Sequence, residues 1–316
     1  MNGTQDSQPH PALADHGITL AELIDQSALE LTQANVAFGH GTMNARDEAI
    51  WLVLWSLGLP LDTDLDESDA LLCAPVKVTD AAKAHALIQS RISTRKPAAY
   101  LTGEAWLQGI PFYVDERAII PRSFIAEVLV DGSIDYWLHN NTRRLLDLCT
   151  GNGSLAILAA MVYPDVVVTG ADLSPDALAV ADINVKKHAL SQRISLLISD
   201  GLASTELQAQ GPFDLIVCNP PYVNAKSMAE LPAEYLAEPA MALDGNPTGG
   251  IDGMDFIRVL IAGAAEALAP RGVLVLEIGN ERAFFEAAFP TLEVVWLNTS
   301  AGEDQVLLIT REALIQ

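Results

Sequence analysis

Four consecutive residues, Asn219-Pro220-Pro221-Tyr222, combine groups that suit the recognition of a planar NH₂ group. They follow the apolar run 213–218, which is typical of a short buried strand. The prolines have a fixed φ and no N–H, so the segment is stiff and cannot continue strand pairing. It offers the Asn219 side-chain oxygen and the Pro220 carbonyl as neutral acceptors beside the Tyr222 ring. An amide or an amino-purine has the complementary shape, although a plain proline-rich loop behind a capping Asn has the same sequence.

A second group of candidate residues lies upstream, in the run Asp147-Leu148-Cys149-Thr150-Gly151-Asn152-Gly153. Its two glycines let the backbone approach a ligand closely and expose N–H groups. An acid, Asp172, follows the next apolar run, where a carboxylate can accept hydrogen bonds from ribose hydroxyls. No third glycine follows at the spacing of the dinucleotide fingerprint. A nucleoside cofactor without a pyrophosphate therefore fits better than NAD.

Asp200-Gly201 follows a third apolar run, at a position where the edge of an adenine can be read. Ordinary alternatives remain open: Asp172 as a helix cap, Asp200 as a turn residue, and Cys149 and Cys218 as small packing residues at strand ends. The resulting candidate cofactor-binding set is Asp147, Cys149, Thr150, Gly151, Asn152, Gly153, Asp172, Asp200, Gly201 and Asn219.

The composition of the 316 residues narrows the class of protein. This length suggests about two domains, and 50% hydrophobic content supports sizeable cores. No apolar stretch is long enough to span a bilayer, and the polar start 1–11 is unlike a signal peptide. Three cysteines at no metal-binding spacing are expected to be free thiols in a reducing cytosol. We expect a cytoplasmic protein without a metal ion and without a membrane anchor.

The net charge of −23 bears on the partner. A nucleic-acid binder normally carries a basic face, whereas a strongly acidic protein repels phosphate and attracts basic partners. The charge therefore favours a basic protein substrate and no direct nucleic-acid contact, while solubility alone explains it equally well.

The first part of the chain, 1–97, reads as a helical domain that begins with an expected disordered segment, 1–16. Thr19 and Glu22 form a capping-box pattern, and Asn44 is placed to cap a second helix that stops at Gly58. A third helix is expected over 79–95. Short β-rich pieces punctuated by glycine and proline then predict a hairpin connector over 98–122.

The remainder, 123–316, alternates between strand and helix patterns after a helix expected over 123–138. Such alternation predicts a mainly parallel sheet covered on both faces. The expected strands are 145–148, 166–169, 194–198, 213–217 and 273–278, with a closing hairpin of 292–297 and 305–310. The expected helices are 154–163, 174–188 and 252–268.

The order of these pieces identifies a resemblance. Asp147–Gly153, Asp172, Asp200-Gly201 and Asn219–Tyr222 together resemble the class I S-adenosylmethionine-dependent methyltransferases, and the subset with Asn-Pro-Pro-Tyr that methylates planar nitrogens. Over nearly its whole length the chain is similar to the protein-glutamine methyltransferases of the HemK-like family. That resemblance implies a Rossmann-like, seven-stranded, mostly parallel sheet with a C-terminal antiparallel hairpin, preceded by a helical domain and a hairpin connector.

Finer features resemble the branch that methylates large-subunit ribosomal protein three. They are Phe38-Gly39-His40-Gly41-Thr42, Asp47-Glu48-Ala49, Ala99-Tyr100-Leu101-Thr102, Phe112-Tyr113-Val114-Asp115-Glu116-Arg117 and Pro121-Arg122-Ser123. The release-factor branch usually has Gly where this chain has Cys149. The loop 244–250 departs from the family pattern and leaves the shape of the substrate entrance open.

The resemblance implies transfer of a methyl group from S-adenosylmethionine to the side-chain amide nitrogen of a protein glutamine. Asn219 and Pro220 would accept the two amide hydrogens and Tyr222 would stack on the amide plane, so these three are the candidate catalytic residues. Together with Pro221 they form the candidate substrate site. Asp147 and Asp172 would favour the cationic sulfonium, and no metal ion is required.

Three alternatives remain open at this point. One is a release-factor glutamine methyltransferase. Another is a DNA adenine-amino methyltransferase, which the charge and the absence of a basic target-recognition domain oppose. The third is a non-catalytic adaptor, which the intact Asn219–Tyr222 segment opposes. We interpret the helical domain as the part that recognises the substrate, His40 as a structural or substrate-contacting residue, and Glu277 as a buried anchor for the site loops.

Overall fold

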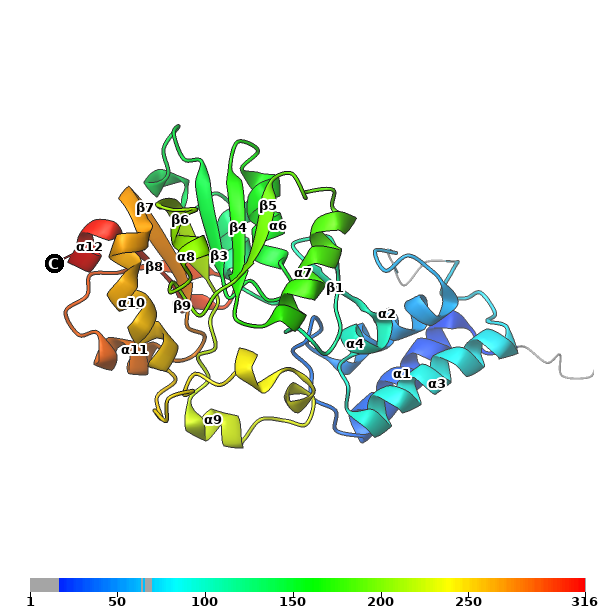
Figure 1. The fold of residues 1–316 in the computed structure, drawn as a ribbon. Helices are drawn as coiled ribbons and strands as arrows, with labels where there is room; N and C mark the ends of the chain where they lie inside the picture. The colour runs from blue at the N-terminus through cyan, green and yellow to red at the C-terminus, as the bar shows by residue number, and fades with distance from the viewer. Residues whose placement is uncertain (1–16, 64, 66–69, 316) are drawn as a thin grey trace, which may run out of the picture. The chain divides into compact units, whose positions relative to one another are not determined.

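The computed structural model describes residues 17–63, 65 and 70–315 (Figure 1). The chain divides into two compact units: one holds residues up to Val36 together with Thr42–Thr94, and the other holds Ala37–Gly41 and the chain from Arg95 onward. The disorder expected for 1–16 lies outside the described residues. The short segment 37–41 is grouped with the second unit, whereas the sequence had suggested that it belongs with the helices.

The first unit consists of α1 (Leu20–Gln33), α2 (Ala45–Leu57) and α3 (Val78–Thr94). The predicted caps are confirmed. Thr19 and Glu22 form a reciprocal capping box, and the Asn44 side chain accepts from the Asp47 N–H at 3.0 Å. Gly58 ends α2 at a φ of 67°, in the left-handed region that glycine adopts without strain.

A buried ion pair lies in the first unit. The Arg91 side chain is fully buried, and its Nε donates to Glu48 Oε1 at 2.7 Å, while Thr42 Oγ1 donates to Glu48 Oε2 at 3.2 Å. These groups lie in a unit whose buried side chains are otherwise mostly apolar: Leu20, Leu23, Ile24, Leu31, Leu52, Val53, Leu54, Ala84 and Ile88. Both charges must therefore remain paired for the unit to be stable.

The second unit begins with α4 (Ala98–Thr102) and the antiparallel hairpin of β1 (Glu104–Leu107) and β2 (Ile110–Tyr113). Gln108 and Gly109 form its two-residue turn with φ values of 49° and 72°, the signs that a type I′ turn requires. The predicted hairpin connector is therefore present in the structure.

The helix predicted over 123–138 is wrong in extent. The structure has α5 (Ile125–Val130) and a separate 3-10 turn, η1 (Asp135–Trp137). Gly132 between them has a φ of 72°, and the Ser133 N–H donates to Asp131 Oδ1 at 2.8 Å. This local turn competes with helix continuation, which an apolar pattern alone does not reveal.

The central sheet has the strand order β5-β4-β3-β6-β7-β9-β8. Strands β3 to β7 are parallel to one another, and β9 is antiparallel to both β7 and β8. This confirms the predicted Rossmann-like fold with its C-terminal antiparallel hairpin. The strands are β3 (Arg144–Leu148), β4 (Val167–Asp172), β5 (Ile194–Ile198), β6 (Phe213–Cys218), β7 (Leu268–Glu277), β8 (Val295–Thr299) and β9 (Gly302–Thr310).

Helices cover both faces of this sheet (Figure 1). Strand β6 is buried on both faces: Leu215 and Val217 pack with α5 and α6, whereas Ile216 and Cys218 pack with α10, as the two-residue strand period requires. The helices that follow α5 are α6 (Ser154–Val162), α7 (Pro175–Lys187), α8 (Thr205–Gln208), α9 (Ala225–Ala229), α10 (Asp255–Ala267), α11 (Arg282–Ala288) and α12 (Arg311–Ile315), with 3-10 turns η2 (Tyr235–Ala237) and η3 (Ala240–Ala242).

Replacing Arg91 by Met should destabilise the first unit by about 3–5 kcal/mol, because the buried Glu48 carboxylate would lose the cation that donates to its Oε1. The free energy of opening of α2 and α3, measured by amide hydrogen exchange, reports this loss. Arg46→Met is the matched control, since Arg46 pairs with Asp25 where both side chains are more than half exposed, and this change should alter stability by at most about 1 kcal/mol. Equal effects of the two substitutions would contradict the assigned role of the buried pair.

Candidate functional site

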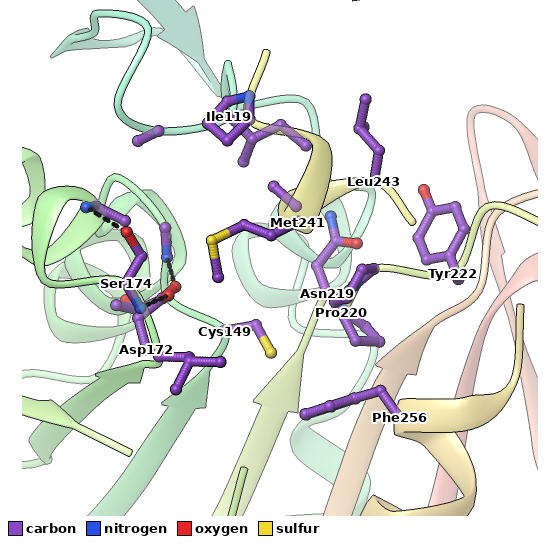
Figure 2. Close-up of a pocket in the computed structure, with 18 of the residues that line it drawn as sticks. Ile119, Cys149, Asp172, Ser174, Asn219, Pro220, Tyr222, Met241, Leu243 and Phe256 are labelled. Atoms are coloured by element: carbon purple, nitrogen blue, oxygen red, sulfur yellow. Dashed lines mark hydrogen bonds between the residues drawn. The ribbon is translucent and has the colours of Figure 1, made fainter. Parts of the chain in front are cut away.

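A cavity of about 810 Å³ opens where the parallel strands end (Figure 2). The order of strands reverses between β3 and β6, and ligands bind at such a switch point in open α/β sheets. Most residues predicted from the sequence line this cavity: Cys149, Thr150, Gly151, Asn152, Asp172, Asp200, Gly201, Asn219, Pro220, Pro221 and Tyr222. Asp147 and Gly153 are not among the lining residues.

The turn after β3 is built from residues with positive φ. Cys149, Gly151 and Gly153 have φ values of 61°, 55° and 80°. A Cβ added at Gly153 would lie 3.1 Å from the Ala181 Cβ, so this glycine lets the start of α6 approach α7. The sequence had suggested that Gly153 serves a ligand, whereas its structural surroundings are those of a helix contact.

Asp147 holds this turn from beneath the cavity. Its Oδ2 accepts from Thr150 Oγ1 at 2.5 Å and from the Ala156 N–H at 2.9 Å, while its buried Oδ1 has no partner among the described residues. Burial raises the pKa of Asp147 to about 7, and no cation pairs with it among the described residues. Asn152 Nδ2 is likewise buried without a partner in the described chain.

Asp172 connects the turn that follows β3 with the turn that follows β4. Its Oδ2 accepts from the Gly151 N–H at 2.8 Å and its Oδ1 accepts from the Ser174 N–H at 2.9 Å. The cap of α7 is Ser174, whose side chain accepts from the Ala177 N–H, so Asp172 is not that cap. Burial raises the pKa of Asp172. A carboxylate has about four accepting positions, so Asp172 keeps accepting capacity for a ligand in the cavity.

The segment after β6 presents the expected groups to the cavity. Asn219 and Tyr222 both line it, and Figure 2 shows the Asn219 amide pointing away from the end of its strand, toward the part that Met241 and Leu243 line. The Pro220 ring lies at the same strand end. Asn219, Pro220 and the aromatic Tyr222 therefore belong to the same cavity as the glycine turn.

Two glycines far along the chain make room for Tyr222. A Cβ added at Gly279 would lie 2.5 Å from the Tyr222 Cε2, and one added at Gly253 would lie 2.1 Å from the Tyr222 carbonyl oxygen. Both glycines also have positive φ, 53° and 78°. Sequence reasoning missed these residues, because only the folded chain brings them against Tyr222.

A cluster around Glu238 forms another part of the site that the sequence did not reveal. Arg122, which lines the cavity, donates to both oxygens of Glu238 at 2.6 and 2.7 Å, and the Ile120 N–H donates to the same carboxylate at 3.0 Å. Although burial opposes it, the attraction of Arg122 and contacts from His40 lower the pKa of Glu238 to about 2.

His40 lies in the second unit and not at the cavity wall. Its ring packs on Tyr235 with centroids 4.2 Å apart, and its Nε2 lies 3.4 Å from Glu238 Oε2. Tyr235 does line the cavity. The geometry therefore supports the structural interpretation of His40, acting on the wall through Tyr235.

Two carboxylates hold the loops that flank Tyr222. Glu281 accepts from the Asn224 side chain at 2.6 Å, directly after the Asn219–Tyr222 segment. Glu277 accepts from Ser123 Oγ at 2.5 Å, as expected of a buried anchor. In the part of the chain that the structure describes, no group of three or more His, Cys, Asp or Glu side chains is arranged to hold a metal ion, and no helix there has the length and apolar character needed to cross a membrane.

Known proteins resemble this chain over most of its length. Residues 134–246 match the family described as the methyltransferase small domain. The ribosomal protein uL3 glutamine methyltransferase of Bordetella pertussis is 50% identical over 298 residues, covering 94% of this chain and 96% of that protein. The enzymes of the same name from Burkholderia pseudomallei and Neisseria gonorrhoeae are 51% and 45% identical, covering 92% and 94% of this chain and 94% and 96% of the respective proteins.

The buried Asp147 should make the second unit less stable as pH rises. Its pKa of about 7 in the folded chain exceeds the ordinary value of 3.8. The folded state therefore binds more protons than the unfolded state between these values, so stability is greatest below the lower value and is lost as pH rises through the higher one. Glu277, with a pKa of about 7, acts in the same direction.

Asp147→Asn should flatten this decline, because the amide oxygen still accepts from Thr150 and Ala156 while the titration is removed. Urea denaturation at several pH values between about 5 and 8 measures the slope. Asp252→Asn is the control: the pKa of Asp252 is lowered by its hydrogen bonds to Arg258, so its titration lies below this range. An unchanged slope in Asp147→Asn would show that Asp147 is already ionised at low pH.

Proposed function

This chain belongs to the family of the ribosomal protein uL3 glutamine methyltransferases, and we propose that it transfers a methyl group from S-adenosylmethionine to the side-chain amide nitrogen of a glutamine in ribosomal protein uL3. One observation carries the proposal: Asn219 and Tyr222 line the same cavity of about 810 Å³ as the glycine turn and Asp172. A donor and an acceptor of a methyl group can therefore meet in one place.

The residues around the glycine turn suit S-adenosylmethionine, which supplies an electrophilic methyl group on a cationic sulfonium. Asp172 has accepting positions left for ribose hydroxyls, and its negative charge favours a cationic ligand. Asp200 and Gly201 line the same cavity and would meet the adenine. The buried, unpartnered Asn152 Nδ2 is a further polar group that a bound ligand or water can satisfy.

The acceptors after β6 fit the chemistry of an amide nitrogen. This nitrogen is a poor nucleophile because its lone pair is delocalised, and it gains positive charge as its new bond to carbon forms. Asn219 Oδ1 and the Pro220 carbonyl would accept its two hydrogens, so their attraction grows as the charge develops. Acceptors that bind the transition state better than the ground state accelerate the reaction.

Tyr222 would fix the plane of the amide by stacking on it. The absence of a side chain at Gly279 leaves room for the edge of this ring, so the stacking surface is already in place before a substrate enters. Such positioning contributes several kcal/mol by itself, because the reacting atoms need not be brought together by chance.

The partner would be a basic protein, since a chain with a net charge of −23 attracts positively charged proteins. We place the chemistry in 123–316, with Arg117–Arg122 of the hairpin connector at the cavity wall, because the lining residues run from Arg117 to Asn280. Choice of the protein substrate would fall to the helical residues up to 97. A ribosomal protein is made and assembled in the cytoplasm, which would be the site of action.

A methyl-transfer assay with labelled S-adenosylmethionine on purified uL3, on a release factor and on duplex DNA tests the proposal. We expect uL3 to be labelled, with peptide mass spectrometry placing the methyl group on a glutamine. Labelling of the release factor alone would show that the protein is a release-factor glutamine methyltransferase instead. Labelling of DNA alone would refute protein methylation.

Asn219→Ala should bind S-adenosylmethionine nearly normally yet turn over about 10²–10³ times more slowly, because one transition-state acceptor is lost. Asp172→Ala should first weaken cofactor binding. Calorimetry and the methyl-transfer assay separate the two effects. Asn280→Ala, at the wall of the same cavity, is the control and should keep near-normal turnover. Near-normal turnover of Asn219→Ala would remove Asn219 from the catalytic role.

Gly279→Ala should lower turnover at least about tenfold, because a Cβ 2.5 Å from the Tyr222 ring forces the ring to move. Gly109→Ala is the matched control. It has a similarly positive φ of 72° but nothing within 4 Å of the added Cβ, so it should lose about 1–2 kcal/mol of stability and keep its turnover. Equal turnover in the two variants would show that the position of Tyr222 does not matter.

A further inference from the structure

Glu277 uses its two oxygens for different tasks. It is the last residue of β7 and only 2% exposed. Its Oε2 accepts three hydrogen bonds at the start of α5, from Ser123 Oγ at 2.5 Å, from the Phe124 N–H at 2.9 Å and from the Ile125 N–H at 3.4 Å. Its Oε1 faces the Tyr222 hydroxyl at 3.5 Å, the long end of hydrogen-bonding distance.

Helix capping alone does not account for this arrangement, because Oε1 takes no part in it. The cation that acts on Glu277, Arg122, is also engaged elsewhere, since it donates to both oxygens of Glu238. The charged groups that act on Glu277 and Tyr222, besides each other, are Arg122 and Glu281. In the described chain, the Tyr222 hydroxyl is thus the group to which Oε1 is directed.

Tyr222 is fixed at two points. Gly279 lies against the ring edge at Cε2, and Glu277 Oε1 lies at the hydroxyl. The first contact, at an atom off the long axis of the ring, limits its rotation, and the second, at the hydroxyl on that axis, holds the tip of the ring. Loss of the second contact would leave the tip of the ring free to move away from its place at the cavity wall.

We propose that Glu277, as a carboxylate, is a positioning residue for methyl transfer that accepts a hydrogen bond from the Tyr222 hydroxyl and thereby keeps the ring in place against the target amide. This inference rests on the function proposed above. Glu277 is not among the residues that line the cavity, so it acts on the proposed reaction through Tyr222, which does line it.

The three hydrogen bonds to Oε2 determine which oxygen of Glu277 takes up a proton. Because three donors already point at Oε2, a proton added to Glu277 goes to Oε1 and turns it from an acceptor into a donor. The hydroxyl hydrogen of Tyr222 must then turn away. Burial raises the pKa of Glu277 to about 7, so turnover should rise with pH across this region as the carboxylate forms.

A double-mutant cycle tests the coupling. Glu277→Gln and Tyr222→Phe should each lower kcat about tenfold, the effect of one hydrogen bond to a charged group. The double variant should be no slower than the single ones, since both remove the same contact. Affinity for S-adenosylmethionine, measured by calorimetry, should stay within about twofold in all three and also shows that they are folded.

The pH profile of kcat is the second readout. The part of the rise near pH 7 that is due to Glu277 should vanish in Glu277→Gln and in Tyr222→Phe. Ser123→Ala is the matched variant: its hydroxyl hydrogen bond lowers the pKa of Glu277, so losing it should move the rise to higher pH without abolishing it. Asp147 also has a pKa of about 7, but its contribution would persist in Tyr222→Phe and is separated in this way.

Multiplying effects in the double variant, or a pH profile of Tyr222→Phe that is the same as that of the wild type, would overturn the inference while wild-type methylation of uL3 still stood. Absence of methylation by the wild type would instead refute the proposed function. If Glu277→Gln fails to bind S-adenosylmethionine, Tyr222→Phe and Ser123→Ala still decide, because each leaves the Glu277 carboxylate in place.

Discussion

Buried and half-buried carboxylates hold the loops at the carboxyl edge of the sheet, and the site depends on them. Each accepts a backbone N–H from a neighbouring turn or another segment: Asp147 from Ala156, Asp172 from Gly151, Glu238 from Ile120, Glu277 from Phe124 and Glu281 from Asn224. Turns rich in glycine and proline bury little surface of their own. A desolvated carboxylate attracts an N–H strongly, so these bonds give the turns a fixed geometry before any ligand arrives.

The partners of these carboxylates determine their charge. Glu238 faces Arg122 and has a pKa of about 2, so it stays ionised at the cavity wall. Asp147 and Glu277 have no cation within ion-pair distance among the described residues, and burial places their pKa values at about 7. Glu238 therefore keeps its negative charge at all ordinary pH values, while Asp147 and Glu277 gain or lose a proton near neutral pH. This distinction connects the stability of the fold with the proposed orientation of Tyr222.

The sequence predicted those parts of the site that local patterns encode. Asn219–Tyr222 and the turn at Gly151 were predicted because strand endings and glycine spacing are local, and the alternation of strands and helices predicted the sheet. The helix expected over 123–138 stopped early at Gly132, where a turn competes with an apolar pattern. Gly253, Gly279 and Glu238 were missed because their partners lie far away; Arg122 and Glu238, for example, are 116 residues apart. A single sequence contains no signal for such contacts.

The most direct measurement is a crystal structure of the protein with S-adenosylhomocysteine and a glutamine-containing peptide of uL3. The account predicts the glutamine Nε2 within about 2.7–3.2 Å of both Asn219 Oδ1 and the Pro220 carbonyl oxygen, with the Tyr222 ring parallel to the amide. A glutamine amide bound elsewhere in the cavity, or an Asn219 side chain turned toward the cofactor with no contact to the peptide, would contradict it.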